Sequence, residues 1–284
     1  MAREQGQEQA KFWLARDLGN FEVLLATFIR HSYSRHTHEG FAIGVIERGG
    51  EEFYYRGASH IAPAGSVVVV NPGELHTGQA ATDEGWSYRM LYPDASLLQR
   101  IATELRGQPS DIPFFPAPVV QDAHVAGIIH HLHLSLEHPT SALERESRLV
   151  DAFARLIARH ADNRLQVRAV KQERPTVRRV REYIEAHYAE NVSLEQLATV
   201  ANLSPFHLLR VFQQEMGLSP HLYLTQIRIA RAKSLLAFGL PIAQIALETG
   251  FVDQSHLTRQ FKRHAGITPG QYAQGSKNIQ DRHG

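Results

Sequence analysis

The pattern of apolar and polar positions in the first third of the chain predicts short β-strands. Residues 41–50 form an apolar run that ends in Gly-Gly, and residues 51–57 follow this expected turn. Residues 66–73 (SVVVVNPG) are rich in β-branched side chains, and residues 86–92 (WSYRMLY) end at a proline. Short β-branched and aromatic runs separated by Gly/Pro turns are typical of a small barrel or sandwich. The N-terminal half is therefore predicted to be rich in strands.

After Asp94 the apolar spacing becomes helical. Residues 94–107 keep this spacing and end at a glycine, and residues 120–137 and 141–160 each repeat apolar side chains at steps of three and four. Such a pair of helices can pack within the chain or against a second copy of it. Both alternatives remain open from the sequence.

Charge and composition divide the chain into two halves. Residues 1–167 carry 15 Lys+Arg and 20 Asp+Glu, a net charge of −5, whereas residues 168–284 carry 15 and 9, a net charge of +6. The predicted domains are 1–165 and 175–275, joined by a linker over 166–174 that lacks a strong apolar pattern. A basic half beside an acidic half favours nucleic-acid binding by the basic one.

The basic half contains two similar pairs of short predicted helices. In the first pair, over 193–215, Ser193 and Gln196 form a capping box before a helix that ends in a tight turn. The second pair, over 241–264, turns at Gly250, and a long helix over 221–239 separates the two pairs. Crossing helices with small inner residues and a tight turn are typical of the helix-turn-helix unit. Two such units in tandem predict an all-α DNA-binding domain.

Residues 227–272 (IRIARAKSLLAFGLPIAQIALETGFVDQSHLTRQFKRHAGITPGQY) resemble the AraC/XylS-type transcription regulators. The resemblance extends over roughly 175–274. It implies that the second helix of each unit enters the major groove, with the two grooves roughly 34 Å apart on one face of the DNA.

The resemblance also assigns DNA-facing roles to particular side chains. Those expected to face bases or neighbouring phosphates are Phe206, His207 and Arg210 in the first unit and Gln254, Ser255, His256, Thr258 and Arg259 in the second. Those expected to contact phosphates, which position the protein without reading sequence, are Arg178, Arg179, Arg228, Lys262 and Arg263. For Arg210 and Arg259, phosphate contact or pairing with an acidic neighbour is the alternative.

The strand-rich half resembles the cupin-like sensor domain that precedes many such DNA-binding domains. The matching elements are His36-x-His38, Pro63-Ala64-Gly65 and the segment 71–76 (NPGELH). The predicted fold class is therefore α+β multidomain: a cupin-like β-barrel with a helical dimerisation segment, followed by the all-α domain. The expected effector-binding residues are His36, His38, Glu74, His76, Trp86 and Tyr88, because an aromatic wall with a few polar groups is usual for a ligand site.

The same histidines raise an alternative function. His36 and His38 share one face of a strand, and His76 could join them to bind a divalent metal, as in a metal-dependent cupin enzyme or a metal sensor. Against this, Ala42 and Ile43 stand where the catalytic cupin pattern has a glutamate. The histidine expected shortly after Pro-x-Gly is also absent. We therefore predict no cofactor and no enzymatic activity.

The sequence lacks both cysteine and long apolar runs, which limits the chemistry and the location expected for the protein. The chain has no cysteine, which excludes disulfides and thiolate chemistry, and no apolar run approaches the roughly 20 residues that span a bilayer. The sequence predicts a cytoplasmic, dimeric, ligand-responsive transcription regulator whose partners are double-stranded DNA, a small-molecule effector and RNA polymerase. Whether it activates or represses, and which effector it binds, stays open.

Overall fold

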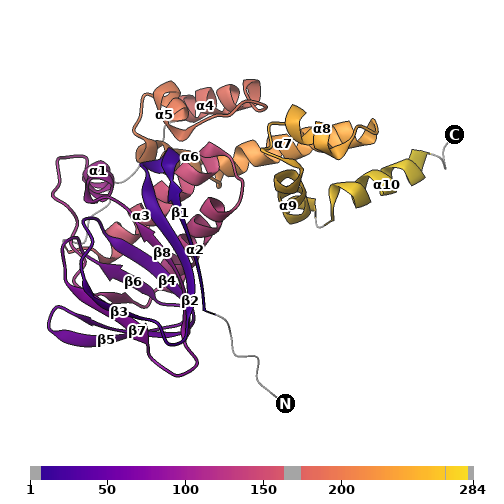
Figure 1. Cartoon of the computed structure of the whole chain (residues 1–284). Coiled ribbons are helices and arrows are strands. Elements are labelled where there is room, and N and C mark those ends of the chain that lie inside the picture. Colours follow the sequence, from indigo (N-terminus) through magenta and orange to yellow (C-terminus); the bar gives the residue numbers. More distant parts are fainter. Residues whose placement is uncertain (1–7, 163–173, 266, 281–284) are drawn as a thin grey trace, which may run out of the picture. The chain divides into compact units, whose positions relative to one another are not determined.

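The protein is described here by a computed structural model over residues 8–162, 174–265 and 267–280 (Figure 1). Its contacts divide the chain into two compact units: residues 1–134 with 148–168, and residues 135–147 with 169–284. All of the predicted linker 166–174 except Arg174 lies outside the described residues.

Antiparallel strands build the first unit. They are β1 (Gln9–Ala15), β2 (Phe21–Phe28), β3 (Ser32–His36), β4 (Ala42–Tyr55), β5 (Ala58–Pro63), β6 (Val67–Val70), β7 (His76–Ala80), β8 (Trp86–Tyr92) and β9 (Val119–Val120). The main path runs β1-β2-β8-β4-β6-β9, while β5 and β7 also pair with β4, and β3 pairs with β7. The predicted β-rich N-terminal domain is confirmed, and because this path has two ends, its sheet is not closed.

Strand β4 corrects the predicted turn at Gly49-Gly50, because the chain continues there as one strand of 14 residues. Its first part pairs with β6 and β8, and its second part pairs with β5 and β7. Gly49 has φ +70°, and a Cβ there would lie 2.0 Å from the carbonyl oxygen of Gly85. The glycine therefore permits a bend and a close approach within the strand. Through this bend, β4 belongs to both parts of the sheet.

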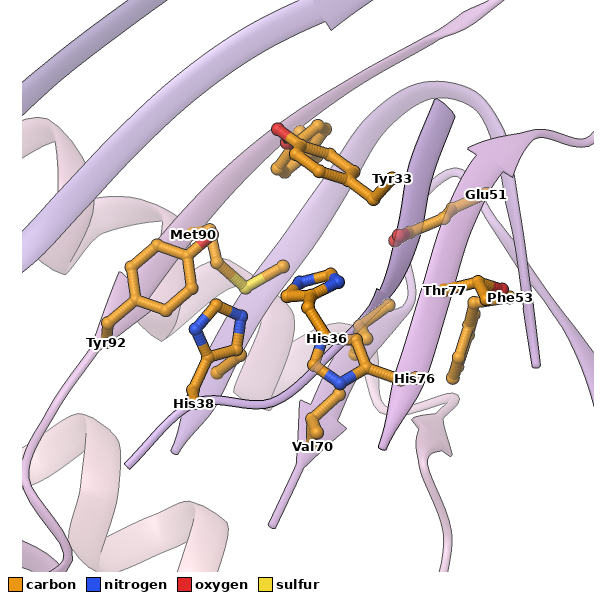
Figure 2. Close-up of a pocket in the computed structure, with 13 residues that line it drawn as sticks. Tyr33, His36, His38, Glu51, Phe53, Val70, His76, Thr77, Met90 and Tyr92 are labelled. Atoms are coloured by element: carbon orange, nitrogen blue, oxygen red, sulfur yellow. The ribbon is translucent and has the colours of Figure 1, made fainter. Parts of the chain in front are cut away.

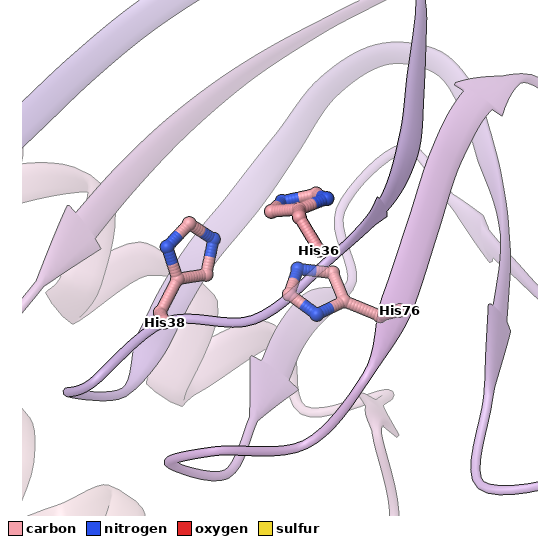
Figure 3. A group of neighbouring side chains, drawn as sticks. All are labelled: His36, His38 and His76. Carbon is pink, nitrogen blue, oxygen red and sulfur yellow. The ribbon is translucent and has the colours of Figure 1, made fainter.

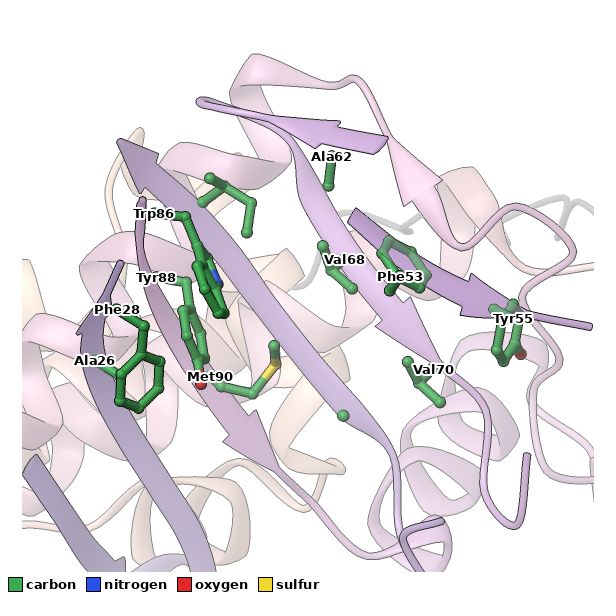
Figure 4. Packing of buried hydrophobic residues seen from close by; sticks show 12 residues of the cluster. Ala26, Phe28, Phe53, Tyr55, Ala62, Val68, Val70, Trp86, Tyr88 and Met90 are labelled. Carbon is green, nitrogen blue, oxygen red and sulfur yellow. The ribbon is translucent and has the colours of Figure 1, made fainter. Parts of the chain in front are cut away.

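Side chains from β2, β4, β5, β6 and β8 form the core of this unit (Figure 4). Trp86 and Tyr88, predicted to share one face of a strand, stack with ring centroids 5.8 Å apart and planes 9° apart. Buried aromatic rings of this size supply a large part of the apolar area that stabilises a small domain.

Three α-helices and one 3-10 helix accompany the strands. They are η1 (Arg16–Leu18), α1 (Ala95–Arg106), α2 (Ala123–Glu137) and α3 (Ala142–His160), and the last three match the predicted helical segments. Along the apolar stripe predicted on α3, Val150 is half-buried and the other four residues are buried: Leu149, Phe153, Leu156 and Ile157. Packing within the chain, rather than a seam between two copies, therefore accounts for this stripe.

The second unit contains seven helices in its described residues. They are α4 (Arg174–Ala186), α5 (Leu194–Ala201), α6 (Pro205–Met216), α7 (Pro220–Ala237), α8 (Ile242–Glu248), α9 (Gln254–Ala265) and α10 (Pro269–Gln280). The two helix-turn-helix units, α5–α6 and α8–α9, are confirmed, and so is the capping box of Ser193 and Gln196. No helix among the described residues has the length and apolar character to cross a membrane.

The turn of the second helix-turn-helix depends on a glycine. Gly250 has φ +77°, and a Cβ there would lie 2.6 Å from the carbonyl oxygen of Ala189. Next to it, Phe251 packs in a buried cluster with side chains of α7, α8 and α9, including Leu257 and Phe261. This cluster fixes α9 against the helix that precedes it.

Candidate functional site

A cavity of about 190 Å³ lies among strands β3, β4, β6, β7 and β8 (Figure 2). Its polar lining comes from Tyr33, His36, His38, Glu51, His76, Thr77, Tyr88 and Tyr92, and its apolar lining includes Phe53, Val70 and Met90. A concave site with an apolar wall and a few convergent polar groups is the usual form of a small-molecule site.

Three histidines gather at one side of this cavity (Figure 3). Antiparallel pairing of β3 with β7 sets His36 opposite His76, and His38 follows two residues after His36. The ring centroids of His36 and His76 lie 4.2 Å apart, and those of His38 and His76 lie 5.1 Å apart. The sequence showed only that three histidines were candidates for one site, and the strand register places them next to one another.

Two of these histidines, His38 and His76, have lowered pKa values. Burial lowers the pKa of His38 to about 4, and the neighbouring His76 and His36 lower it further. Burial also lowers the pKa of His76, against the opposing effect of its hydrogen bond to the backbone of Glu74. Near neutral pH these two rings therefore carry no charge.

Glu51 places a carboxyl group in the same cavity. The residue is 8 % exposed, and its Oε2 atom has no hydrogen-bond partner among the described residues. Burial raises the pKa of this carboxyl to about 8. A buried carboxyl that is uncharged at neutral pH can donate as well as accept a hydrogen bond.

Phenol groups complete the polar side of the cavity. The hydroxyl groups of Tyr33 and Tyr88 are 2.8 Å apart and share a hydrogen bond. Burial raises the pKa of Tyr92 well above its ordinary range, and also that of Tyr88. All these hydroxyls therefore stay protonated and are able to donate.

The cavity includes four of the six predicted effector residues: His36, His38, His76 and Tyr88. The other two do not line it. Trp86 is buried in the core, and Glu74 lies with its Oε1 3.8 Å from Nε of Arg56.

Sequence reasoning missed Tyr33, Glu51 and Tyr92. For Glu51 a signal was present, because it alternates along β4 with the buried Phe53 and Tyr55 and so shares their inward face. Because a turn was expected at Gly49-Gly50, residues 51–55 were not recognised as part of the same strand, and this alternation was missed.

The second candidate site is the exposed surface of α9 together with part of α6. On α9, Gln254, Ser255 and Arg259 are exposed, as are Lys262 and Arg263 further along the helix. Thr258 on α9 and His207 and Arg210 on α6 are partly exposed, and Arg178 and Arg179 on α4 are exposed. Arg259 donates a hydrogen bond of 3.0 Å to the carbonyl oxygen of Pro139.

Three predicted DNA-facing residues are buried, and their outward placement was wrong. Phe206 is 7 % exposed, and the guanidinium of Arg210 lies over its ring at 5.6 Å. His256 is 2 % exposed and packs edge-on against the ring of Phe251 at 5.3 Å.

The third, Arg228, is 3 % exposed. Its guanidinium donates to the carbonyl oxygens of Tyr188 and Glu190, each at 2.7 Å. It therefore ties the segment after α4 to α7 and is not placed to contact a phosphate.

Comparison with known proteins identifies two domains. The family described as AraC-like ligand binding domain matches residues 18–153, and the family described as helix-turn-helix domain matches residues 197–275. The first match contains the histidine cavity, and the second contains α6 and α9.

Individual relatives match most of the chain. The HTH-type transcriptional regulator YbfI of Bacillus subtilis is 31% identical over 81% of this chain and 82% of its own length. The HTH-type transcriptional activator RhaS of Escherichia fergusonii is 26% identical over 86% of this chain and 88% of its own. Among solved structures, the C-terminal domain of AraT from Geobacillus stearothermophilus is 39% identical, covering 36% of this chain and 85% of that one, with a TM-score of 0.35.

Proposed function

This chain belongs to the AraC/XylS-type transcription regulators, and from that premise we propose how its residues divide the work. It is a DNA-binding regulator with an N-terminal ligand-binding domain, and not an enzyme. In our proposal the effector binds in the histidine cavity of the first unit, and the exposed face of α9 reads the DNA sequence.

The observation that carries the effector site is the set of buried polar groups that converge on one cavity. Glu51, Tyr33 and Tyr88 offer hydroxyl and carboxyl groups, while Phe53 and Met90 supply apolar contact. Burying polar groups costs free energy unless a partner satisfies them. An effector with hydroxyl or carbonyl groups would supply such partners, so we infer a small polar molecule.

For DNA reading we propose a smaller set of residues than the sequence suggested. Gln254, Ser255, Thr258 and Arg259 of α9 would face base edges, and His207 and Arg210 of α6 would contribute in the first unit. Arg178 and Arg179 on α4, with Lys262 and Arg263 on α9, would contact phosphates.

Regulation in this proposal requires that the effector binds one state of the protein more tightly than another, since only differential affinity shifts an equilibrium. We further propose that the protein acts as a cytoplasmic homodimer that can contact RNA polymerase. Sedimentation of the protein with and without DNA tests the dimer.

One pair of variants tests the division of labour. Operator DNA is selected from a random pool, and effectors are found by the rise in melting temperature that a binder of the folded state produces. Glu51→Gln, which is nearly the same size, should weaken the effector response and leave DNA affinity unchanged. Gln254→Ala should weaken DNA binding and leave the effector-induced melting shift unchanged. Loss of both functions in either variant, with folding intact, would contradict the proposal.

A further inference from the structure

We propose that His36, His38 and His76 bind one divalent transition-metal ion, whose open coordination position faces the cavity and takes an oxygen atom of the effector. This inference rests on the proposed function, because it names the chemistry by which the cavity would hold its ligand. The metal would be a binding group in a regulator, with no catalytic step.

The first support is convergence of the three side chains. Each offers one ring nitrogen, and these three atoms lie within 4.8 Å of one another. A tetrahedral zinc ion with bonds of about 2.1 Å holds its ligand atoms about 3.4 Å apart, so small side-chain rotations suffice to bring the nitrogens to a common centre. Figure 3 shows the three rings grouped around one space, with His36 on β3, His38 in the segment that follows β3, and His76 on β7.

The second support is the hydrogen bonding behind the rings. Nδ1 of His36 lies 2.8 Å from the carbonyl oxygen of Ser34, and Nδ1 of His76 lies 3.0 Å from that of Glu74. A carbonyl oxygen only accepts, so each Nδ1 carries the proton and each Nε2 keeps its lone pair. Metal-binding histidines usually make this same bond from the ring nitrogen that does not bind the metal. The two rings are therefore fixed in the form and orientation that a metal requires.

The third support is the unpartnered Glu51 carboxyl. The residue is more than nine-tenths buried and lines the same cavity, with Oε2 unbonded among the described residues (Figure 2). Three protein ligands leave a metal with at least one open position. An effector oxygen bound there, with another polar group on Glu51, would satisfy both the metal and the carboxyl.

The donor set selects the class of metal. Imidazole nitrogens suit zinc, nickel, iron and copper, whereas magnesium and calcium prefer oxygen ligands. The effector is accordingly expected to carry a carboxylate, carbonyl or hydroxyl oxygen.

Cobalt(II) provides the test, because its visible absorption reports tetrahedral coordination. The full chain is purified without a histidine tag, stripped with a chelator and titrated with Co²⁺. The expected result is one equivalent bound with a tetrahedral spectrum. His38→Ala and His76→Ala should each weaken binding by about 100-fold or more, since even outer partners of metal ligands change affinity by 10–100-fold.

A control is needed because the chain contains 17 histidines. His131 is exposed on α2 and bonds only to the Gly127 carbonyl of its own helix among the contacts described, so His131→Ala should bind Co²⁺ like the unaltered chain. Melting temperature and DNA affinity confirm that each variant folds. Equal Co²⁺ affinity in all variants, or binding without a fixed stoichiometry, would overturn the metal site.

The open position has its own test. Adding acetohydroxamate, which chelates through two oxygens, should change the Co²⁺ spectrum of the loaded protein, and an unchanged spectrum would overturn the open position. If the stripped protein binds no Co²⁺ yet a metabolite still raises its melting temperature, the metal inference fails and the effector proposal stands. If Co²⁺ binds as expected but Glu51→Gln leaves every effector response intact, the effector site proposed above fails instead.

Discussion

Asn71 and Phe115 exchange two hydrogen bonds inside the first unit. The side-chain amide of Asn71 donates to the Phe115 carbonyl at 2.9 Å, and the Phe115 amide donates back to the Asn71 side-chain oxygen at 2.9 Å. The same amide nitrogen lies 2.9 Å from the Tyr55 hydroxyl. Both partners are buried, so the pair fixes the segment before β9 next to the end of β6, where Val70 lines the cavity.

Replacing Asn71 by alanine should therefore destabilise the first unit. Two backbone groups of Phe115 would lose this partner, and the Tyr55 hydroxyl would keep only the longer hydrogen bond of 3.4 Å from the residue 71 amide. Each buried group left unsatisfied costs about 1–3 kcal/mol. We expect a loss of about 2–4 kcal/mol, measured as a lower urea midpoint with an unchanged slope. Asn191→Ala, at an exposed loop position, serves as control and should change the midpoint little. A midpoint for Asn71→Ala equal to that of the control would contradict this role.

Asp122 joins the two ends of the α2–α3 pair. Its Oδ1 accepts from the amides of His124 and Val125 at the start of α2, and its Oδ2 accepts from Arg159 at 2.8 Å and His160 at 2.9 Å. Burial alone would raise the pKa of this carboxyl, but the hydrogen bonds from His160, Val125 and Arg159 outweigh it and lower the pKa to about 2.

The sign of the resulting pH dependence follows from the lowered pKa. The stability that Asp122 contributes is complete above its unfolded pKa of 3.8 and is lost as pH falls toward about 2. Asp122→Asn keeps an oxygen that can accept from the amides of α2 but loses the negative charge that pairs with Arg159 and His160. The change should therefore cost about 1–2 kcal/mol at pH 7, and the difference should shrink between pH 4 and pH 2. Urea titrations at several pH values measure this, and a constant difference down to pH 2 would refute the linkage.

Arg228 should behave as a structural residue. Arg228→Ala removes the guanidinium donor from the Tyr188 carbonyl and leaves the Glu190 carbonyl with the Val192 amide. We expect a loss of about 2–4 kcal/mol in the stability of the helical unit. Weakened DNA binding should follow the fraction unfolded, with the dependence of affinity on salt unchanged. If the variant is fully stable and the salt dependence of its DNA affinity falls by the amount expected for one phosphate contact, then Arg228 contacts a phosphate as the sequence predicted.

Arg259 and Lys262 should differ in how they affect DNA binding. Both are exposed on α9. Arg259→Ala should weaken binding to selected operator DNA by about 1–3 kcal/mol and relax specificity at one position, with little effect on random DNA. Lys262→Ala should weaken binding to all sequences similarly and reduce the salt slope by about one. Competition assays at several salt concentrations separate the two roles, and equal behaviour of the variants would remove the base-reading role of Arg259.

Local periodicity predicted the helical half most completely. The capping box at Ser193, the prolines that begin helices and the glycine turn at Gly250 are short-range signals, because helix ends are satisfied by nearby residues. Whether a single side chain on these helices is buried or exposed was less predictable. Phe206 and His256 were predicted to face outward, yet both are buried, and His256 packs against the ring of Phe251.

The sequence alone determined the net charge of +1, which divides into −5 for the first half and +6 for the second. It also determined the repeated helix-turn-helix pattern. Only the tertiary structure showed which strands pair and which side chains are buried. The register of β3 against β7 sets His36 beside His76, and the bend at Gly49 carries Glu51 into the same cavity. Pairing between distant strands depends on contacts across the whole sheet, so the spacing of these residues along the chain could not reveal it. Long-range packing also buries Arg228, which the sequence predicted to face DNA. Its guanidinium donates to the Glu190 carbonyl, so Arg228 stabilises the helical unit instead of contacting a phosphate.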